Sequence, residues 1–153
     1  MARESLTLLA KAAEKQVIAF GPQEVSMTCW AIGTLSGRAP QELLGLLPVL
    51  LRRVEGITLK PQQVATVVWA AAKLEPARRT ALSSELGAVT REVLRVAPEF
   101  LAQELSNVVW ATGALSTSPL LEALPVLVKE VAAKAGPRLG PQELRSIQDT
   151  DGH

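Results

Sequence analysis

The chain has 153 residues, of which 48% are hydrophobic and 3% aromatic, and its formal net charge is +1. This length and composition predict one compact domain or a short run of small repeats, with a core of aliphatic side chains and alanine. The nearly neutral charge excludes a strong overall attraction to nucleic acid or anionic lipid, and the absence of an 18-residue apolar run predicts no membrane insertion.

Cys29 is the only cysteine and His153 the only histidine. An internal disulfide, a Cys/His metal site, a Ser/His/Asp triad and a Cys/His pair are therefore excluded. We expect no metal, no cofactor and no enzymatic activity. Glu4 and Glu14 lie within the first fifteen residues and the apolar run there is short, so no targeting peptide is predicted.

Along the chain, residues 3–20 are predicted to form a first helix, and a distinctive segment follows at 22–35, PQEVSMTCWAIGTL. The same pattern returns at 61–74 as PQQVATVVWAAAKL and at 102–115 as AQELSNVVWATGAL, and a fourth copy begins at 141–144 as PQEL. The tryptophans are 39 and then 41 residues apart, which gives an internal period of about 40 residues. The residues that define this signature are Pro22, Trp30, Pro61, Trp69, Trp110 and Pro141.

Each copy, called a Trp segment below, has the pattern of a helix. Proline suits the first helical turn, and apolar residues recur at steps of three and four. Small residues lie four before and three after each tryptophan, which indicates close helix approach. The tryptophan itself has two interpretations, a packing knob between repeats or a ligand-stacking group. The small residues are Ser26, Ala65, Ser106, Gly33, Ala72 and Gly113.

Amphipathic partner segments lie between the Trp segments. Residues 42–54 and 122–131 share Leu-Pro-Val-Leu, and the corresponding third segment covers about 79–96. Pro48 and Pro125 must each lie in a first turn or kink a helix, because proline within a helix costs about 3 kcal/mol. Helix breaks are expected at 36–37, 75–76, 116–119 and 136–137.

The predicted fold is all-α: an α-solenoid of paired antiparallel helices with about 40 residues per repeat, three repeats and the start of a fourth. Residues 1–153 form one helical-repeat domain, with repeats at about 1–37, 38–76, 77–117 and, in part, 118–153. No polar capping helix is expected at the C-terminal end, and the last residues are typical of a truncated repeat.

The Trp segments resemble the octotricopeptide repeat, whose core reads Pro-Gln-Glu-Leu-Ala-Asn-x-x-Trp-Ala-Leu-Ala-x-Leu; Asn107 matches the family's asparagine. With the partner segments, the resemblance covers nearly the whole chain. It implies a superhelix that binds single-stranded RNA in chloroplasts or mitochondria and acts in RNA processing, stability or translation. Related repeats occur in proteins with a RAP domain, and such proteins also serve as organelle ribosome subunits that contact rRNA and other proteins. Ala102 departs from the pattern, and three repeats would read few bases.

Six variable positions remain outward on the Trp segments: Gln23, Met27, Gln62, Thr66, Gln103 and Asn107. Amide and hydroxyl groups suit a modular reader of splayed bases. The alternative is that the glutamines cap or solvate the first helical turn and that the others are ordinary surface. The candidate phosphate contacts are Lys60, Lys73, Arg52, Arg53 and Lys129. The alternative is that these cations belong only to solvated helix faces and bind no phosphate.

Two functions follow from these patterns. The first is single-stranded RNA or rRNA binding in organelle gene expression. The second is a protein interaction scaffold within a larger organelle complex that makes no direct RNA contact. The scaffold function is motivated by the low net charge and by the apolar side chains of one partner helix. These side chains lie on more faces of the helix than a single groove can bury, and an exposed apolar patch is typical of a binding surface. They are Leu43, Leu44, Leu46, Leu47, Val49, Leu50 and Leu51.

Overall fold

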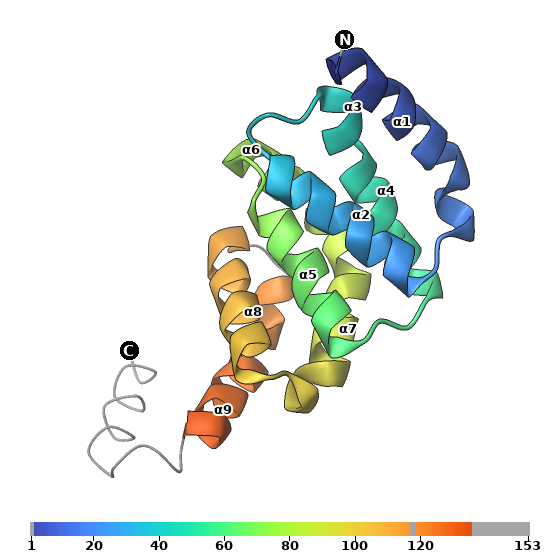
Figure 1. The fold of residues 1–153 in the computed structure, drawn as a ribbon. Coiled ribbons are helices and arrows are strands. Elements are labelled where there is room, and N and C mark those ends of the chain that lie inside the picture. The colour runs from blue at the N-terminus through green and yellow to red at the C-terminus, as the bar shows by residue number, and fades with distance from the viewer. Residues whose placement is uncertain (1, 117–118, 136–153) are drawn as a thin grey trace.

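The computed structural model describes residues 2–116 and 119–135, and every regular element in that part of the chain is helical (Figure 1). The predicted all-α class is therefore confirmed. The helices are α1 (Ala2–Gln16), α2 (Pro22–Leu35), α3 (Gln41–Leu44), α4 (Leu46–Arg53), α5 (Pro61–Ala72), α6 (Pro76–Ala81), α7 (Leu86–Val96), α8 (Ala102–Leu115) and α9 (Leu124–Ala135). Short 3-10 turns lie at Val17–Ala19, Val54–Gly56, Ser83–Glu85, Ala97–Glu99 and Leu120–Ala123.

The three Trp segments form α2, α5 and α8, called the Trp helices from here on. Each begins at the residue that the pattern predicts. The third residue of each helix closes the first turn by accepting a hydrogen bond from the N–H that precedes the helix. These bonds join Gly21 to Glu24 (2.8 Å), Lys60 to Gln63 (2.8 Å) and Leu101 to Glu104 (2.9 Å). The Pro-Gln-Glu motif thus marks a helix start.

The partner segments are more broken than predicted. Residues 42–54 divide into α3 and α4 at Gly45, so that Pro48 is the third residue of α4. Pro125 is the second residue of α9. Both prolines lie in a first turn, where the missing N–H has no intrahelical partner to lose. For Pro48 both interpretations apply, since Gly45 keeps helical dihedral angles and its N–H donates to the Gln41 carbonyl (2.8 Å), so the first turn of α4 is also an interruption between two helical segments.

The Trp helices lie side by side on one face of the molecule, with α4 and α7 behind them (Figure 1). The expectation of an exposed leucine-rich partner helix is wrong. Helix α4 contacts α1, α2 and α7, so its apolar side chains are covered from several directions. Five of the seven side chains are buried and two are half-buried against the core: Leu44, Leu46, Leu47, Leu50 and Leu51, then Leu43 and Val49.

The predicted close helix approach is confirmed between α2 and α5. A Cβ atom added to Gly33 would lie 2.6 Å from Trp69 Cζ3 and 3.1 Å from the Ala70 Cα atom. Glycine at this position therefore lets the indole of α5 lie directly on the backbone of α2. For Trp69, this contact agrees with the interpretation as a packing knob.

Lysine and arginine side chains of the partner helices donate hydrogen bonds to the links, the short segments that precede each Trp helix. Arg53 donates to the Phe20 carbonyl (3.0 Å), Arg95 to the Leu59 carbonyl, and Lys134 to the Pro98 carbonyl (3.3 Å). In each case the cation lies in the predicted repeat after the one that contains the carbonyl: Arg53 in 38–76, Arg95 in 77–117 and Lys134 in 118–153. These three bonds, called the link contacts below, tie the residues that precede each Trp helix to a later helix.

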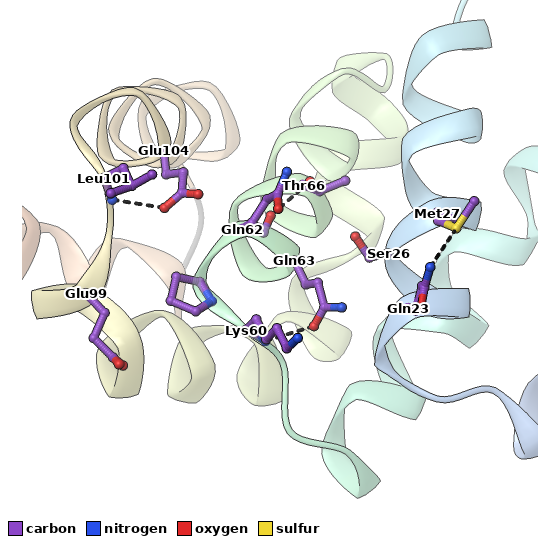
Figure 2. A pocket seen from close by; sticks show the side chains of 11 residues that line it. Gln23, Ser26, Met27, Lys60, Gln62, Gln63, Thr66, Glu99, Leu101 and Glu104 are labelled. Carbon is purple, nitrogen blue, oxygen red and sulfur yellow. Dashed lines mark hydrogen bonds between the residues drawn. The ribbon is translucent and has the colours of Figure 1, made fainter.

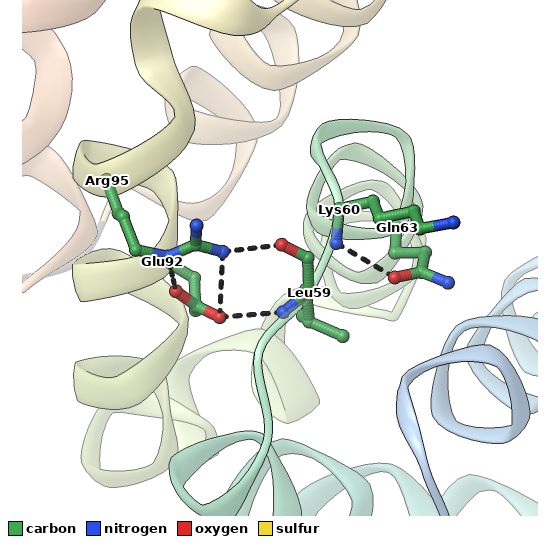
Figure 3. Close-up of polar contacts among 5 residues, drawn as sticks. All are labelled: Leu59, Lys60, Gln63, Glu92 and Arg95. Carbon is green, nitrogen blue, oxygen red and sulfur yellow. Dashed lines mark hydrogen bonds and ion pairs between the residues drawn. The ribbon is translucent and has the colours of Figure 1, made fainter.

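The middle link has an additional partner (Figure 3). The buried carboxylate of Glu92 accepts a hydrogen bond from the Leu59 N–H (2.9 Å) and pairs with Arg95. Burial alone would raise the pKa of Glu92, but the bonds from Arg95 and Leu59, with the charge of Arg95, together lower it below the ordinary value. The fold therefore stabilises the ionised form of Glu92.

No helix in residues 2–116 and 119–135 is long and apolar enough to cross a membrane. The fourth copy of the motif, with Pro141, and the predicted break at 136–137 lie outside the described residues.

Candidate functional site

Two adjoining grooves run across the outer face of the Trp helices. The first has a volume of about 660 Å³ and is lined by residues from α2, α5 and the start of α8. Figure 2 shows Gln23 and Met27 on one side of it, Gln62 and Thr66 near the middle, and Glu104 on the other side. The second groove, of about 450 Å³, continues between α5 and α8.

All six variable positions of the Trp helices line these grooves. The first groove is lined by Gln23, Met27, Gln62 and Thr66, and the second by Gln62, Thr66, Gln103 and Asn107. Three separate sequence copies therefore contribute side chains to one continuous face. The sequence predicted these positions by elimination, because the other faces of each helix were assigned to packing.

The polar groups of the grooves are partly engaged within the protein. The Thr66 hydroxyl donates to the Gln62 carbonyl (2.9 Å), which leaves its oxygen as an acceptor. The Gln23 amide lies 3.8 Å from the Met27 sulfur. Within the described part of the chain, the side-chain amides of Gln62, Gln103 and Asn107 make no hydrogen bond. Amide donors and acceptors therefore face the grooves.

The first helical turns are capped by Glu24, Gln63 and Glu104, one residue beyond the glutamines that were considered for this role. Gln23, Gln62 and Gln103 are exposed. The capping interpretation of these glutamines is therefore wrong, and their amides remain available to a ligand or to water.

The tryptophans differ in their surroundings. Trp30 and Trp69 line the second groove, whereas Trp110 does not. Trp30 is 57% exposed and Trp110 is 50% exposed, but Trp69 is half-buried against Gly33. The Lys73 ammonium lies 5.7 Å from the centre of the Trp69 ring, within reach of a cation–π contact. Trp30 thus presents the freest aromatic face in the grooves.

The five candidate phosphate contacts do not gather at the grooves. Lys60 lines the first groove, but the carboxylates of Glu99 and Glu104 line it as well. Arg52 pairs with Glu85 (3.2 Å), and Arg53 makes one of the link contacts. Arg52 and Arg53 thus have partners within the fold, and Lys129 is exposed on α9.

Two groups were not found from the sequence. Leu101 is 69% exposed and lines both grooves, because it precedes α8 and projects from the link. The link contacts were missed since each joins residues more than thirty positions apart. The recurrence of a cation near the end of each partner segment was the available signal.

The lone thiol offers no reactive group. Cys29 is buried in α2, and burial raises the pKa of its thiol to about 12. It is therefore protonated at neutral pH. In residues 2–116 and 119–135, no group of three or more His, Cys, Asp or Glu side chains is placed to hold a metal ion.

No protein-family model, no curated protein and no solved structure matches this chain.

Proposed function

We propose that this chain is an α-solenoid of paired antiparallel helices that binds single-stranded RNA across the Trp helices. By its resemblance to octotricopeptide repeats, it would act in organelle RNA processing, stability or translation, or as an organelle ribosome subunit. The observation that supports this function is the convergence of one variable side-chain set from three sequence copies on two adjoining grooves.

The chemistry of the second groove fits an unstacked base. Gln62, Gln103 and Asn107 offer amide donors and acceptors for a base edge, and the Thr66 oxygen can accept a further hydrogen bond. The half-exposed indole of Trp30 in the same groove offers a stacking surface. Aromatic stacking of this kind contributes about 1–3 kcal/mol per base.

The charges predict a weak electrostatic contribution. Among the residues that the structure describes, Lys60 is the one cation that lines the first groove, and two carboxylates accompany it. On single strands the slope of log K against log salt is roughly −0.7 per neutralised phosphate. We therefore expect RNA binding whose salt slope corresponds to about one phosphate, with the bases supplying most of the affinity.

The direct test measures fluorescence anisotropy of labelled, random single-stranded RNA with four proteins. These are the unmodified chain, Lys60→Glu, Thr66→Ala/Asn107→Ala, and Lys129→Glu as a control with the same charge change outside the grooves. Lys60→Glu is expected to weaken binding several-fold and flatten the salt slope by roughly 0.7. The double variant is expected to weaken binding by roughly fivefold to 150-fold and to alter base preference, since each of the two lost hydrogen bonds contributes about 0.5–1.5 kcal/mol.

Absence of binding by the unmodified chain at micromolar protein and low salt would contradict this function. Equal loss of affinity in Lys60→Glu and Lys129→Glu would place the RNA elsewhere on the surface.

A protein interaction scaffold is the second candidate. The observation that favours it is the exposure of large apolar side chains near the N-terminal end, where Leu8, Leu9 and Ile18 are 68%, 65% and 81% exposed. When exposed apolar side chains form a contiguous patch, they are typical of a surface that binds another subunit. This function predicts self-association or stable incorporation into a larger assembly. A monodisperse monomer in light scattering would count against it.

A further inference from the structure

The polar groups that line the second groove differ in which hydrogen bonds they can make. The amides of Gln62, Gln103 and Asn107 each carry a donor and an acceptor, so they can pair with the edge of any base. The Thr66 oxygen adds one acceptor. Among the described residues of this groove, Glu104 is the one carboxylate, and a carboxylate only accepts hydrogen bonds. Glu104 is therefore the group that can tell one base edge from another.

The first turn of α8 holds the Glu104 side chain in place. One carboxylate oxygen accepts the hydrogen bond from the Leu101 N–H (2.9 Å), and the residue is half-buried. Figure 2 shows the other oxygen on the side of the carboxylate that faces Gln62 and Thr66. Within residues 2–116 and 119–135, this second oxygen makes no hydrogen bond or ion pair. The cap thus presents a positioned acceptor to the grooves.

The equivalent residues of the other Trp helices have different surroundings. Glu24 and Gln63 make the same cap at the starts of α2 and α5. Gln63 lines the first groove and Glu104 lines both grooves, whereas Glu24 lines neither. This difference arises because each groove lies between a Trp helix and the one before it, and α2 is the first of the series. Of the three caps, only Glu104 brings a carboxylate to a ligand in the grooves.

We propose that Glu104 selects the base bound in the second groove and favours a base with an exocyclic amino group over uracil. The inference rests on the proposed function, because it concerns RNA in the same groove. Cytosine offers its N4 amino group as a donor to the free carboxylate oxygen. Uracil carries a carbonyl oxygen at that position, and its N3–H lies between two carbonyl oxygens. The carboxylate therefore gains a hydrogen bond with cytosine and meets a repelling acceptor with uracil.

The selection acts against uracil rather than for a single base. Adenine and guanine also carry exocyclic amino groups, and the amides of the groove can adapt to the rest of either edge. The charge of Glu104 repels the phosphates of every strand, so it lowers affinity for all RNA while it separates the bases. The ratio of affinities for two strands of equal length removes the shared repulsion and isolates the selection.

The test measures fluorescence anisotropy of labelled oligocytidylate and oligouridylate of equal length with the unmodified chain, Glu104→Gln and Glu24→Gln. Gln63 makes the same cap with an amide oxygen (2.8 Å), so both variants should retain the fold, which far-ultraviolet circular dichroism checks. Glu24→Gln is the matched control, since it makes the same change in an equivalent cap outside the grooves.

The unmodified chain and Glu24→Gln are expected to bind oligocytidylate at least roughly tenfold more tightly than oligouridylate, the ratio that one hydrogen bond to a charged group supplies. In Glu104→Gln this ratio should fall several-fold, mainly because oligouridylate binds more tightly. An amide can donate to the uracil oxygen, which the carboxylate cannot do.

A change in the RNA gives a second measurement that needs no substitution in the protein. A strand of the cytidine analogue that lacks the 4-amino group has no donor for Glu104. It should lose most of the advantage of oligocytidylate with the unmodified chain, and it should lose little with Glu104→Gln.

Equal ratios in Glu104→Gln and Glu24→Gln would overturn the inference and leave RNA binding intact. Equal affinity of the unmodified chain for oligocytidylate and for the analogue would do the same. Absence of binding by every strand would overturn the proposed function and this inference together.

Discussion

Gly33→Ala is expected to destabilise the protein by about 2 kcal/mol, within the range for overpacking a dense interior. The new methyl group would lie 2.6 Å from the Trp69 ring and 3.1 Å from the backbone of Ala70, so α2 and α5 must move apart. Urea denaturation followed by circular dichroism measures the change as a lower midpoint at an unchanged slope.

The control is Gly87→Ala in α7, where the nearest atom to the added methyl group is Arg91 Nη1 at 3.9 Å. This is an ordinary contact, and alanine favours a helix over glycine by about 0.5–1 kcal/mol. The two Gly→Ala substitutions should therefore have opposite signs. A neutral or stabilising Gly33→Ala would show that α2 and α5 do not approach as closely as described.

Glu92→Ala is expected to lower the free energy of unfolding at pH 7 by about 2 kcal/mol, because hydrogen bonds to charged groups contribute about 1.5–3 kcal/mol. The substitution leaves the Leu59 N–H without its acceptor and removes the carboxylate that pairs with Arg95, which keeps its bond to the Leu59 carbonyl. The expected result is a lower urea midpoint. Glu55→Ala is the control, since Glu55 and Arg91 form an ion pair (3.6 Å) in which both side chains are largely exposed; its effect should be far smaller.

The same variant gives a prediction for pH. The fold lowers the pKa of Glu92, so the stabilisation is complete above the unfolded-state value, about 4.3 for glutamate, and is lost as the pH falls through the lower folded-state value. The difference in urea midpoint between Glu92→Ala and the unmodified protein should therefore shrink as the pH is lowered from 7 to 3. A difference that is constant across this range would mean that Glu92 is not held as the ionised form.

The Trp helices were predictable because their signals are local. A proline in the first turn and a repeated tryptophan place the beginning and the register of α2 and α5, and α8 follows from its likeness to them. The groove positions followed by elimination once the packing faces were assigned. Local order and repetition therefore predict both the Trp helices and the residues that line their outer face.

The partner helices were less predictable, since their structure depends on neighbours that are distant in sequence. Pro48 fits both a first turn and a kink, and nothing local decides between them. The leucines of α4 looked too numerous to bury because periodicity reports the faces of a helix but not how many helices surround it. Arg53 looked like a surface cation because its partner, the Phe20 carbonyl, is 33 positions away.

The link contacts of Phe20, Leu59 and Pro98 also bear on the order in which the molecule loses structure. Each one couples the start of a Trp helix to a cation in the following helix pair, so the free energy of each pair includes a contribution from its neighbour. Removal of α9 would release the link before α8 directly, while the link before α2 would keep Arg53. We therefore expect unfolding to be transmitted from one helix pair to the next, rather than to occur as the independent melting of separate hairpins.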